Sequence, residues 1–120
     1  MRVARGLIRL AMEIARNAHP REFLGFLRER DGVVKEIQII PGTVTTGSSA
    51  FFRSIMKPID FHIVGSIHSH PSGSVEPSPE DLITFSRTGK LHIIVAYPYC
   101  EDCWAAYDRE GRPVQVELVD

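Results

Sequence analysis

The sequence has no apolar run near the roughly 18 residues that a membrane-spanning helix requires. Its first residues also lack a signal peptide's continuous apolar stretch, because Arg2, Arg5 and Arg9 interrupt them. Neither sign of charge dominates, since 14 Lys and Arg stand against 15 Asp and Glu, with a formal net charge of -1. This balance gives no electrostatic reason to expect binding to nucleic acid or to an anionic membrane. We therefore expect a cytoplasmic protein with neither kind of partner.

Cysteine is scarce, since the chain has only Cys100 and Cys103. A structural zinc site built on such a Cys-x-x-Cys pair needs two further thiolates or histidines at regular spacing, and no second cysteine pair exists. Redox motifs of the thioredoxin kind lie at a helix N-terminus, whereas this pair precedes residues with a strand pattern. We expect either free thiols or a local disulfide at a turn.

The composition that remains is typical of a globular protein. Hydrophobic residues make up 43% of the 120 residues and charged residues 24%, which argues against a disordered or fibrous chain. No repeat or linker interrupts the sequence, and its length suits one hydrophobic core. We expect a single domain over residues 1–120.

Two helices are predicted. Between residues 7 and 18 the apolar residues recur at intervals of three and four, and His19-Pro20 ends this pattern because the residue before proline is driven out of the helical region. A second helix is expected over residues 79–87, with Ser78 as its N-cap and Gly89 just beyond its end. Single histidines at a helix end (His19) or inside a strand (His92) are more often structural than functional.

Strands are expected where β-prone residues alternate or form short runs, at residues 22–28, 33–40, 51–56, 61–68, 91–96, 104–107 and 114–119. Asp31-Gly32 predicts a tight hairpin between the first two strands. Residues 108–111 would join the last two, and residues 41–50 form a loop. This order predicts a mixed α/β fold, in which two to three helices pack on a curved, largely antiparallel or mixed sheet.

The segment from 65 to 81 holds the residues with metal-binding chemistry. His68 and His70 are two apart at a strand end, so both imidazoles project to the same side, and Pro71 stops the strand. Asp81 lies in the first turn of the following helix and points back towards that strand end. Two nitrogens and one carboxylate oxygen suit zinc, and three protein ligands leave a position for water, as in catalytic zinc sites.

A second interpretation of part of this segment is purely structural. Ser78 and Asp81 have the spacing of a helix capping box, with aspartate where glutamate or glutamine is commoner. A His-x-His pair in a loop can also arise without function. The histidine pair, the proline and the following acidic residue together favour the metal site.

His68-Ser69-His70-Pro71, Ser78 and Asp81 resemble the His-x-His-Pro and Ser-x-x-Asp signature of the JAMM (MPN+) metalloproteases, and Glu22-Phe23-Leu24-Gly25 supplies the family's upstream Glu-x-x-Gly. The resemblance covers nearly the whole chain and is greatest to short archaeal single-domain members. It implies a cytidine deaminase-like fold and one Zn²⁺ per chain, held by the two histidines and the aspartate. It also implies ubiquitin-like small modifier proteins and their conjugates as partners.

The same resemblance implies the catalytic roles. Glu22 would take a proton from zinc-bound water and return it to the departing amine, while the Ser78 hydroxyl would stabilise the developing oxyanion. Glu13 is a rival base, but its helical register places it on the polar face.

Several alternatives stay open. The same chemistry could trim the C-terminus of a ubiquitin-like sulfur carrier, and family members without metal ligands act as binding or scaffold modules. A zinc nucleobase deaminase requires His-x-Glu and Pro-Cys-x-x-Cys motifs that this chain lacks. Residues 50–57 are the expected edge for docking a substrate tail. The sequence does not indicate an oligomeric state, a linkage preference or a particular target.

Overall fold

The computed structural model describes residues 1–39 and 61–120. In chain order its elements are β1 (Arg2–Ala4), α1 (Arg5–Ala18), β2 (Leu24–Arg30), β3 (Val33–Ile39), β4 (Ile63–His70), α3 (Pro79–Thr88), β5 (Leu91–Ala96), β6 (Trp104–Tyr107) and β7 (Glu117–Val119). The predicted loop 41–50, strand 51–56 and docking edge 50–57 lie outside the described residues.

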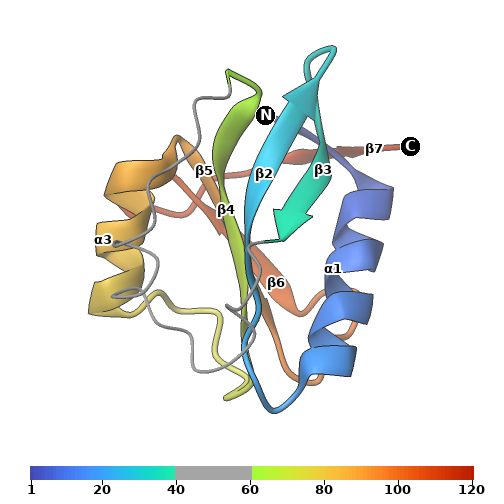
Figure 1. Ribbon diagram of the computed structural model, residues 1–120, viewed down its shortest axis with the longest axis vertical. Helices are drawn as coiled ribbons and strands as arrows, with labels where there is room; N and C mark the ends of the chain where they lie inside the picture. The colour runs from blue at the N-terminus through green and yellow to red at the C-terminus, as the bar shows by residue number, and fades with distance from the viewer. Residues whose placement is uncertain (40–60) are drawn as a thin grey trace.

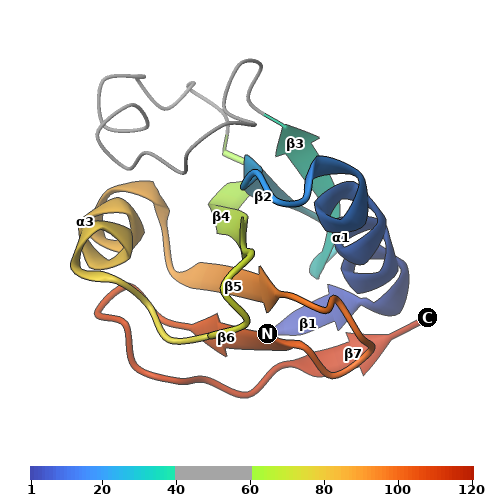
Figure 2. The same ribbon diagram turned by 90° about the horizontal axis from the view of Figure 1, so that it is seen from below.

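The strands form one curled sheet in the order β6-β5-β4-β2-β3-β1-β7. Antiparallel pairs are β2–β3, β2–β4 and β5–β6, while β4–β5, β1–β3 and β1–β7 are parallel. Figures 1 and 2 show α1 and α3 on opposite sides of this sheet. The predicted mixed α/β fold with helices on a curved sheet is confirmed.

Each helix covers its own apolar cluster. The buried face of α1 contributes Leu7, Ile8, Ala11, Met12 and Ala15 to the larger core, where they meet buried residues of the sheet such as Leu27 and Ile67. On the other side, Phe85 of α3 packs with Ile94 and Tyr107. The sheet is therefore apolar on both faces, which explains why all six residues of β5 are buried.

The hairpin between β2 and β3 turns where the sequence predicts. Arg30 pairs with Val33 across a two-residue loop. Asp31 and Gly32 both have positive φ, of 54° and 79°. A two-residue turn of this kind matches the twist of the flanking strands and favours Asp-Gly.

Two predicted strands are displaced by two residues. β4 spans Ile63–His70 instead of residues 61–68, because His70 still pairs with Ala96 in the parallel ladder and Phe61 is 95% exposed. β2 begins at Leu24, where pairing with His68 starts, so Glu22 precedes the strand instead of opening it.

The chain ends pair in a way that periodicity did not reveal. β1 was not predicted, since three residues before a helix carry no alternation, yet it pairs with both β3 and β7. β7 is shorter than the predicted strand 114–119. The expected hairpin through residues 108–111 is limited to a bridge between Tyr107 and Pro113, and β7 adds to the opposite edge of the sheet.

The order β4–α3–β5 positions the site. Because β4 and β5 are parallel, the chain must cross over between them, and α3 forms that crossover. The N-terminus of α3 consequently lies beside the end of β4 where His68 and His70 stand. On its other side β4 pairs with antiparallel β2, whose beginning carries the segment of Glu22 to the same end of the sheet.

Close packing of β4 against β5 leads to a stability prediction. A Cβ atom at Gly65 would overlap the carbonyl oxygen of Leu91, whereas at exposed Gly6 in α1 it would meet nothing within 4 Å. We expect Gly65→Ala to lower the free energy of unfolding by at least about 2 kcal/mol. Gly6→Ala should leave it unchanged or raise it by up to ~1 kcal/mol. Urea denaturation of both variants checks this, and equal effects would contradict the steric argument.

Candidate metal centre

The side chains of His68, His70 and Asp81 converge at one point. Their ligand-capable atoms all lie within 4.8 Å of one another. His68 Nε2 is 3.0 Å from His70 Nε2 and 3.1 Å from Asp81 Oδ1, and His70 Nε2 is 3.1 Å from Asp81 Oδ2. Three residues that are separated in the sequence thus point the atoms that coordinate metals at each other.

The regular geometry of β4 and of α3 explains why these three side chains meet. His68 and His70 alternate with buried Ser69 along β4, so both rings stand on the same face of the sheet. Pro79 occupies the first turn of α3 and Ser78 is its N-cap, as predicted. The first turn then directs Asp81 back towards β4.

Asp81 makes both the contacts of a helix capping box and the contacts expected of a metal site. Ser78 Oγ accepts from the backbone N–H of Asp81 at 3.1 Å, and Asp81 Oδ2 accepts from the backbone N–H of Ser78 at 2.9 Å. The same carboxylate faces both imidazoles. The cap therefore fixes the orientation of Asp81, so helix capping and the approach to the histidines do not exclude one another.

Hydrogen bonding and charge shape the electrostatics of this cluster. Burial alone would raise the pKa of Asp81, but hydrogen bonds from His68 and His70 hold it far below its ordinary value. Burial alone would lower the pKa of His70. The pKa is nevertheless raised, because His70 forms hydrogen bonds with Asp81 and the Ser74 carbonyl and lies near the negative charges of Asp81 and Glu22. The aspartate is thus an anion, and the site attracts positive charge.

The donor set fits a divalent metal ion. The Ser74 carbonyl oxygen accepts from His70 Nδ1 at 2.8 Å, which leaves the Nε2 lone pair directed at Asp81 and His68. Donor atoms 3.0–3.1 Å apart are close to the edge of about 3.3 Å that four ligands around zinc define. At this spacing the lone pairs of the two imidazoles and the carboxylate would repel one another unless a proton or a cation lay between them. His68 Nδ1 is buried and has no hydrogen-bond partner among the described residues.

Glu22 is held near these three residues by the segment that leads into β2. Ser69, between the two histidines, donates N–H to the Phe23 carbonyl at 3.2 Å, and its Oγ accepts from Phe23 N–H at 3.0 Å. Since Leu24 pairs with His68, continuing the antiparallel register places Glu22 opposite His70. Glu22 is half-buried, and its charge acts on His70. The structure therefore brings Glu22 to the same end of the sheet as the three convergent residues.

Two supporting residues were not foreseen. Ser69 occupies the variable position of His-x-His, and its buried hydroxyl ties β4 to the segment of Glu22. Ser74 contributes only a backbone carbonyl to His70. The alternation of β4 could have indicated that Ser69 faces away from the histidines, towards the core, but no side-chain pattern reports which carbonyl a loop presents.

Residues predicted to be structural are placed accordingly. His92 is fully buried, its Nδ1 accepts from Ser66 Oγ at 2.7 Å, and its Nε2 donates to the Gly89 carbonyl at 2.8 Å. His19 follows the end of α1. Cys100 and Cys103 form a disulfide, so the local-disulfide alternative holds and the free-thiol alternative is wrong.

Comparison with known proteins gives consistent relatives. Residues 4–109 match the family described as prokaryotic homologues of the JAB domain. A protein of Haloferax volcanii named probable metalloprotease is 42% identical over an alignment that covers 98% of this chain and 79% of that protein.

Solved structures agree with the fold. The crystal structure of a JAB1/MPN domain protein from Archaeoglobus fulgidus is 41% identical, with a TM-score of 0.83 and 100% of both chains covered. A structure titled as a JAMM metalloprotease-like zinc site in the proteasome and signalosome is 39% identical, with a TM-score of 0.78 over 100% of this chain and 98% of that one. Neither helix of the described residues is long and apolar enough to cross a membrane.

The buried position of His92 leads to a pH-dependent prediction. Burial lowers its pKa to about 4, with hydrogen bonding to Gly89 opposing the shift in part. The unfolded chain therefore binds more protons between pH 6.5 and 4, so stability is lost as the pH falls through this range. From pH 7 to pH 5 we expect wild type to lose about 2 kcal/mol more unfolding free energy than His92→Gln. Parallel urea titrations of both proteins at the two pH values measure this, and equal losses would contradict it.

Proposed function

This chain belongs to the family of prokaryotic homologues of the JAB domain, and we propose that it is a zinc-dependent isopeptidase that removes ubiquitin-like small modifier proteins from their conjugates. The observation that carries the proposal is the convergence of His68, His70 and Asp81, with Glu22 approaching from the segment just before β2. Family membership and the relative named probable metalloprotease support hydrolysis by a metal-dependent mechanism.

The three convergent residues would hold the ion. His68 and His70 offer Nε2 and Asp81 offers a carboxylate oxygen, which is the donor set typical of catalytic zinc. Zinc, when bound, supplies a Lewis acid that polarises water and the scissile carbonyl. The capping box keeps Asp81 oriented, and the Ser74 carbonyl keeps the His70 ring in the tautomer whose Nε2 lone pair is available.

Glu22 is proposed as the general base and then the general acid. Its carboxylate would accept a proton from the attacking water and deliver that proton to the departing lysine amine, which leaves poorly as an anion. Its place opposite His70 supports this role, because a base must lie beside the water that it activates. Exposed Glu13 of α1, whose carboxylate lies 3.5 Å from Arg16, is the rejected alternative.

Ser78 is proposed to stabilise the oxyanion. Its oxygen accepts from the backbone N–H of Asp81, a bond that leaves its own proton free for donation. The hydroxyl would donate to the carbonyl oxygen as that atom gains negative charge during attack.

The class of substrate comes from the family resemblance and remains a proposal. An isopeptide bond to lysine and a peptide bond near the C-terminus of a modifier present the same amide to the site, so this chemistry serves both. Assays with a lysine conjugate and with a tail-extended ubiquitin-like carrier, run side by side, distinguish deconjugation from trimming.

The decisive experiment removes the proposed base. We expect Glu22→Gln to lower kcat for conjugate cleavage by about 10²- to 10⁴-fold, because the amide cannot accept the proton, with zinc content unchanged. Glu13→Gln is the matched control, since it makes the same chemical change on an exposed face of α1 and should retain full activity. Gel-based cleavage and metal analysis of the purified proteins provide both measurements.

Metal dependence completes this experiment. Chelation should abolish cleavage and added zinc should restore it. Full cleavage by Glu22→Gln or by the metal-free protein would refute the mechanism. Zinc well below one per chain after purification with added zinc would favour a binding module over an enzyme.

Substitution of Ser78 separates its two roles. We expect Ser78→Ala to lower the unfolding free energy by about 1 kcal/mol through loss of the cap, and to lower kcat by about 10²-fold through loss of the donor. Ser78→Thr retains a hydroxyl and should recover most of both quantities. If Ser78→Ala is destabilised but turns over at the wild-type rate, Ser78 is a capping residue and not a catalytic one.

A further inference from the structure

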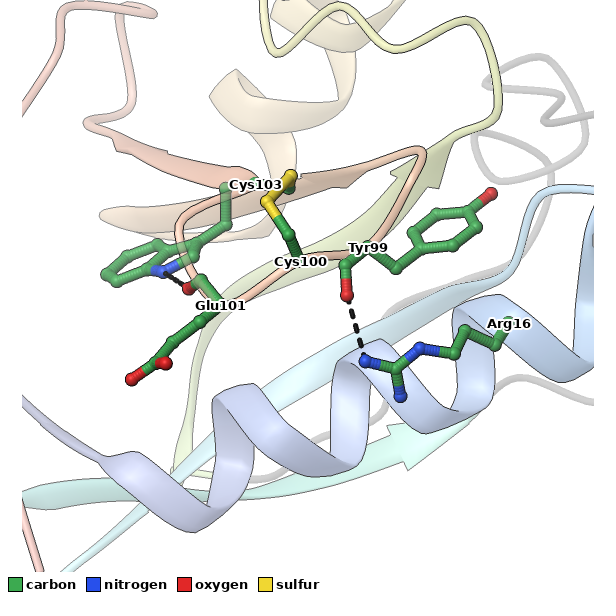
Figure 3. Close-up of a disulfide and its surroundings, with 6 residues drawn as sticks. Arg16, Tyr99, Cys100, Glu101 and Cys103 are labelled. Carbon is green, nitrogen blue, oxygen red and sulfur yellow. Dashed lines mark hydrogen bonds between the residues drawn. A yellow bond between two sulfur atoms is a disulfide. The ribbon is translucent and has the colours of Figure 1, made fainter.

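The turn between β5 and β6 is closed by the Cys100–Cys103 disulfide and by backbone hydrogen bonds. Cys103 N–H donates to the Cys100 carbonyl at 3.0 Å, and Ala96 N–H donates to the Cys103 carbonyl at 2.8 Å. The Trp104 indole N–H donates to the Glu101 carbonyl at 3.1 Å. Figure 3 shows this turn beside α1, with Tyr99 immediately before the disulfide. None of the roles proposed above uses it.

Tyr99 is held in an unusual conformation. Its φ is 63°, a value that residues other than glycine adopt only where their surroundings hold them. Its carbonyl oxygen accepts from the Arg16 guanidinium of α1 at 2.9 Å (Figure 3), and its N–H donates to the Ala96 carbonyl at 2.8 Å. The residue is only 2% exposed. The turn and α1 together fix where the phenol group lies.

The phenol contacts the segment that leads to Glu22. A hydrogen bond of 2.8 Å joins the Tyr99 hydroxyl to His19 Nδ1, and the two rings meet edge to face at 5.5 Å. The ring of exposed Tyr97 also stacks on the His19 ring at 4.9 Å, and it meets the Tyr99 ring edge to face at 5.9 Å. His19 is therefore anchored at a defined place against the β5–β6 turn.

Glu22 lies between two such anchors. Upstream is the His19–Tyr99 bond, downstream is the reciprocal Phe23–Ser69 pair, and only residues 20–22 lie between them. Burial raises the pKa of Tyr99, and the charge of Glu22 raises it further. The phenol thus stays protonated, and Glu22 lies close enough to act on it.

We propose that Tyr99 is a positioning residue for Glu22, acting through His19 and held in place by the Cys100–Cys103 disulfide. This inference rests on the role of Glu22 in the proposed function. Small displacements of a catalytic base lower the rate steeply, so loss of the upstream anchor lowers kcat without affecting metal binding.

The first test does not require activity. Hydrogen exchange of the backbone N–H groups of residues 21–23 is compared in wild type, Tyr99→Phe and Tyr97→Phe. Tyr99→Phe keeps the buried ring and loses only the hydroxyl, so exchange should rise by about 3- to 10-fold. Tyr97→Phe removes a hydroxyl from the exposed neighbour and should leave exchange unchanged. Equal exchange in all three proteins would overturn the inference.

The second test is kinetic. Tyr99→Phe should lower kcat by about 3- to 10-fold with KM and zinc content unchanged, and Tyr97→Phe should match the kcat of wild type. In a Glu22→Gln background the Tyr99→Phe change should have no further effect, because the two residues act on one step. A persisting loss in that background, or full activity of Tyr99→Phe, would overturn the inference and leave the proposed function intact.

The disulfide is tested separately. Cys100→Ser combined with Cys103→Ser should reproduce the faster exchange of residues 21–23 and the lower kcat. Wild-type protein that has been reduced with a phosphine and then freed of the reagent should behave in the same way. In that reduction the phosphine takes oxygen from water and becomes its oxide, while the disulfide becomes two thiols. If the double variant and the reduced protein both keep the exchange rates and the kcat of untreated wild type, the disulfide does not hold Tyr99. Failure of wild type to cleave any conjugate while exchange responds as expected would refute the function and not the anchor.

Discussion

The carboxylate of Asp81 is the interaction on which the site depends. One oxygen atom accepts from the N-cap backbone of α3 while both oxygens face the imidazoles of β4. A helix cap fixes the carboxylate because the first N–H groups of a helix have no partners within it. The histidines in turn keep its pKa low, although burial opposes this. A single anion thus connects the start of a helix to the end of a strand, and the gap between them becomes a site for a cation.

Topology explains why these elements meet. A parallel pair cannot be joined by a tight turn, so the chain leaves β4, passes through α3 and returns along β5. The crossover delivers the helix N-terminus to the strand end that bears His68 and His70. Antiparallel pairing of β2 on the other side of β4 delivers Glu22 to the same end. The proposed ligands therefore come from two elements and the proposed base from the segment just before a third, and the sheet ladder sets their relative positions.

Support around the site comes from atoms with no catalytic chemistry of their own. Ser69 ties β4 to the residue after Glu22, and the Ser74 carbonyl orients His70. The disulfide-closed turn reaches the other side of Glu22 through Tyr99 and His19. Groups that act in acid–base chemistry must be held within a fraction of an ångström, and such neighbouring hydrogen bonds are how proteins achieve this. His92 shows the contrast, since its ring is buried with both nitrogens bonded and serves the core alone.

The sequence by itself determined the residue types of the site and the local elements that carry them. His-x-His before proline, Ser-x-x-Asp at a helix start and Asp-Gly between β-prone runs are signals that neighbouring residues create, so the convergence of His68, His70 and Asp81 and the hairpin were both predictable. Only the tertiary structure decided the exact strand limits, the β1–β7 edge and the anchors of Glu22. These depend on which strands become neighbours and on which backbone carbonyls face a side chain. Such contacts join residues far apart in the chain, and no local pattern encodes them.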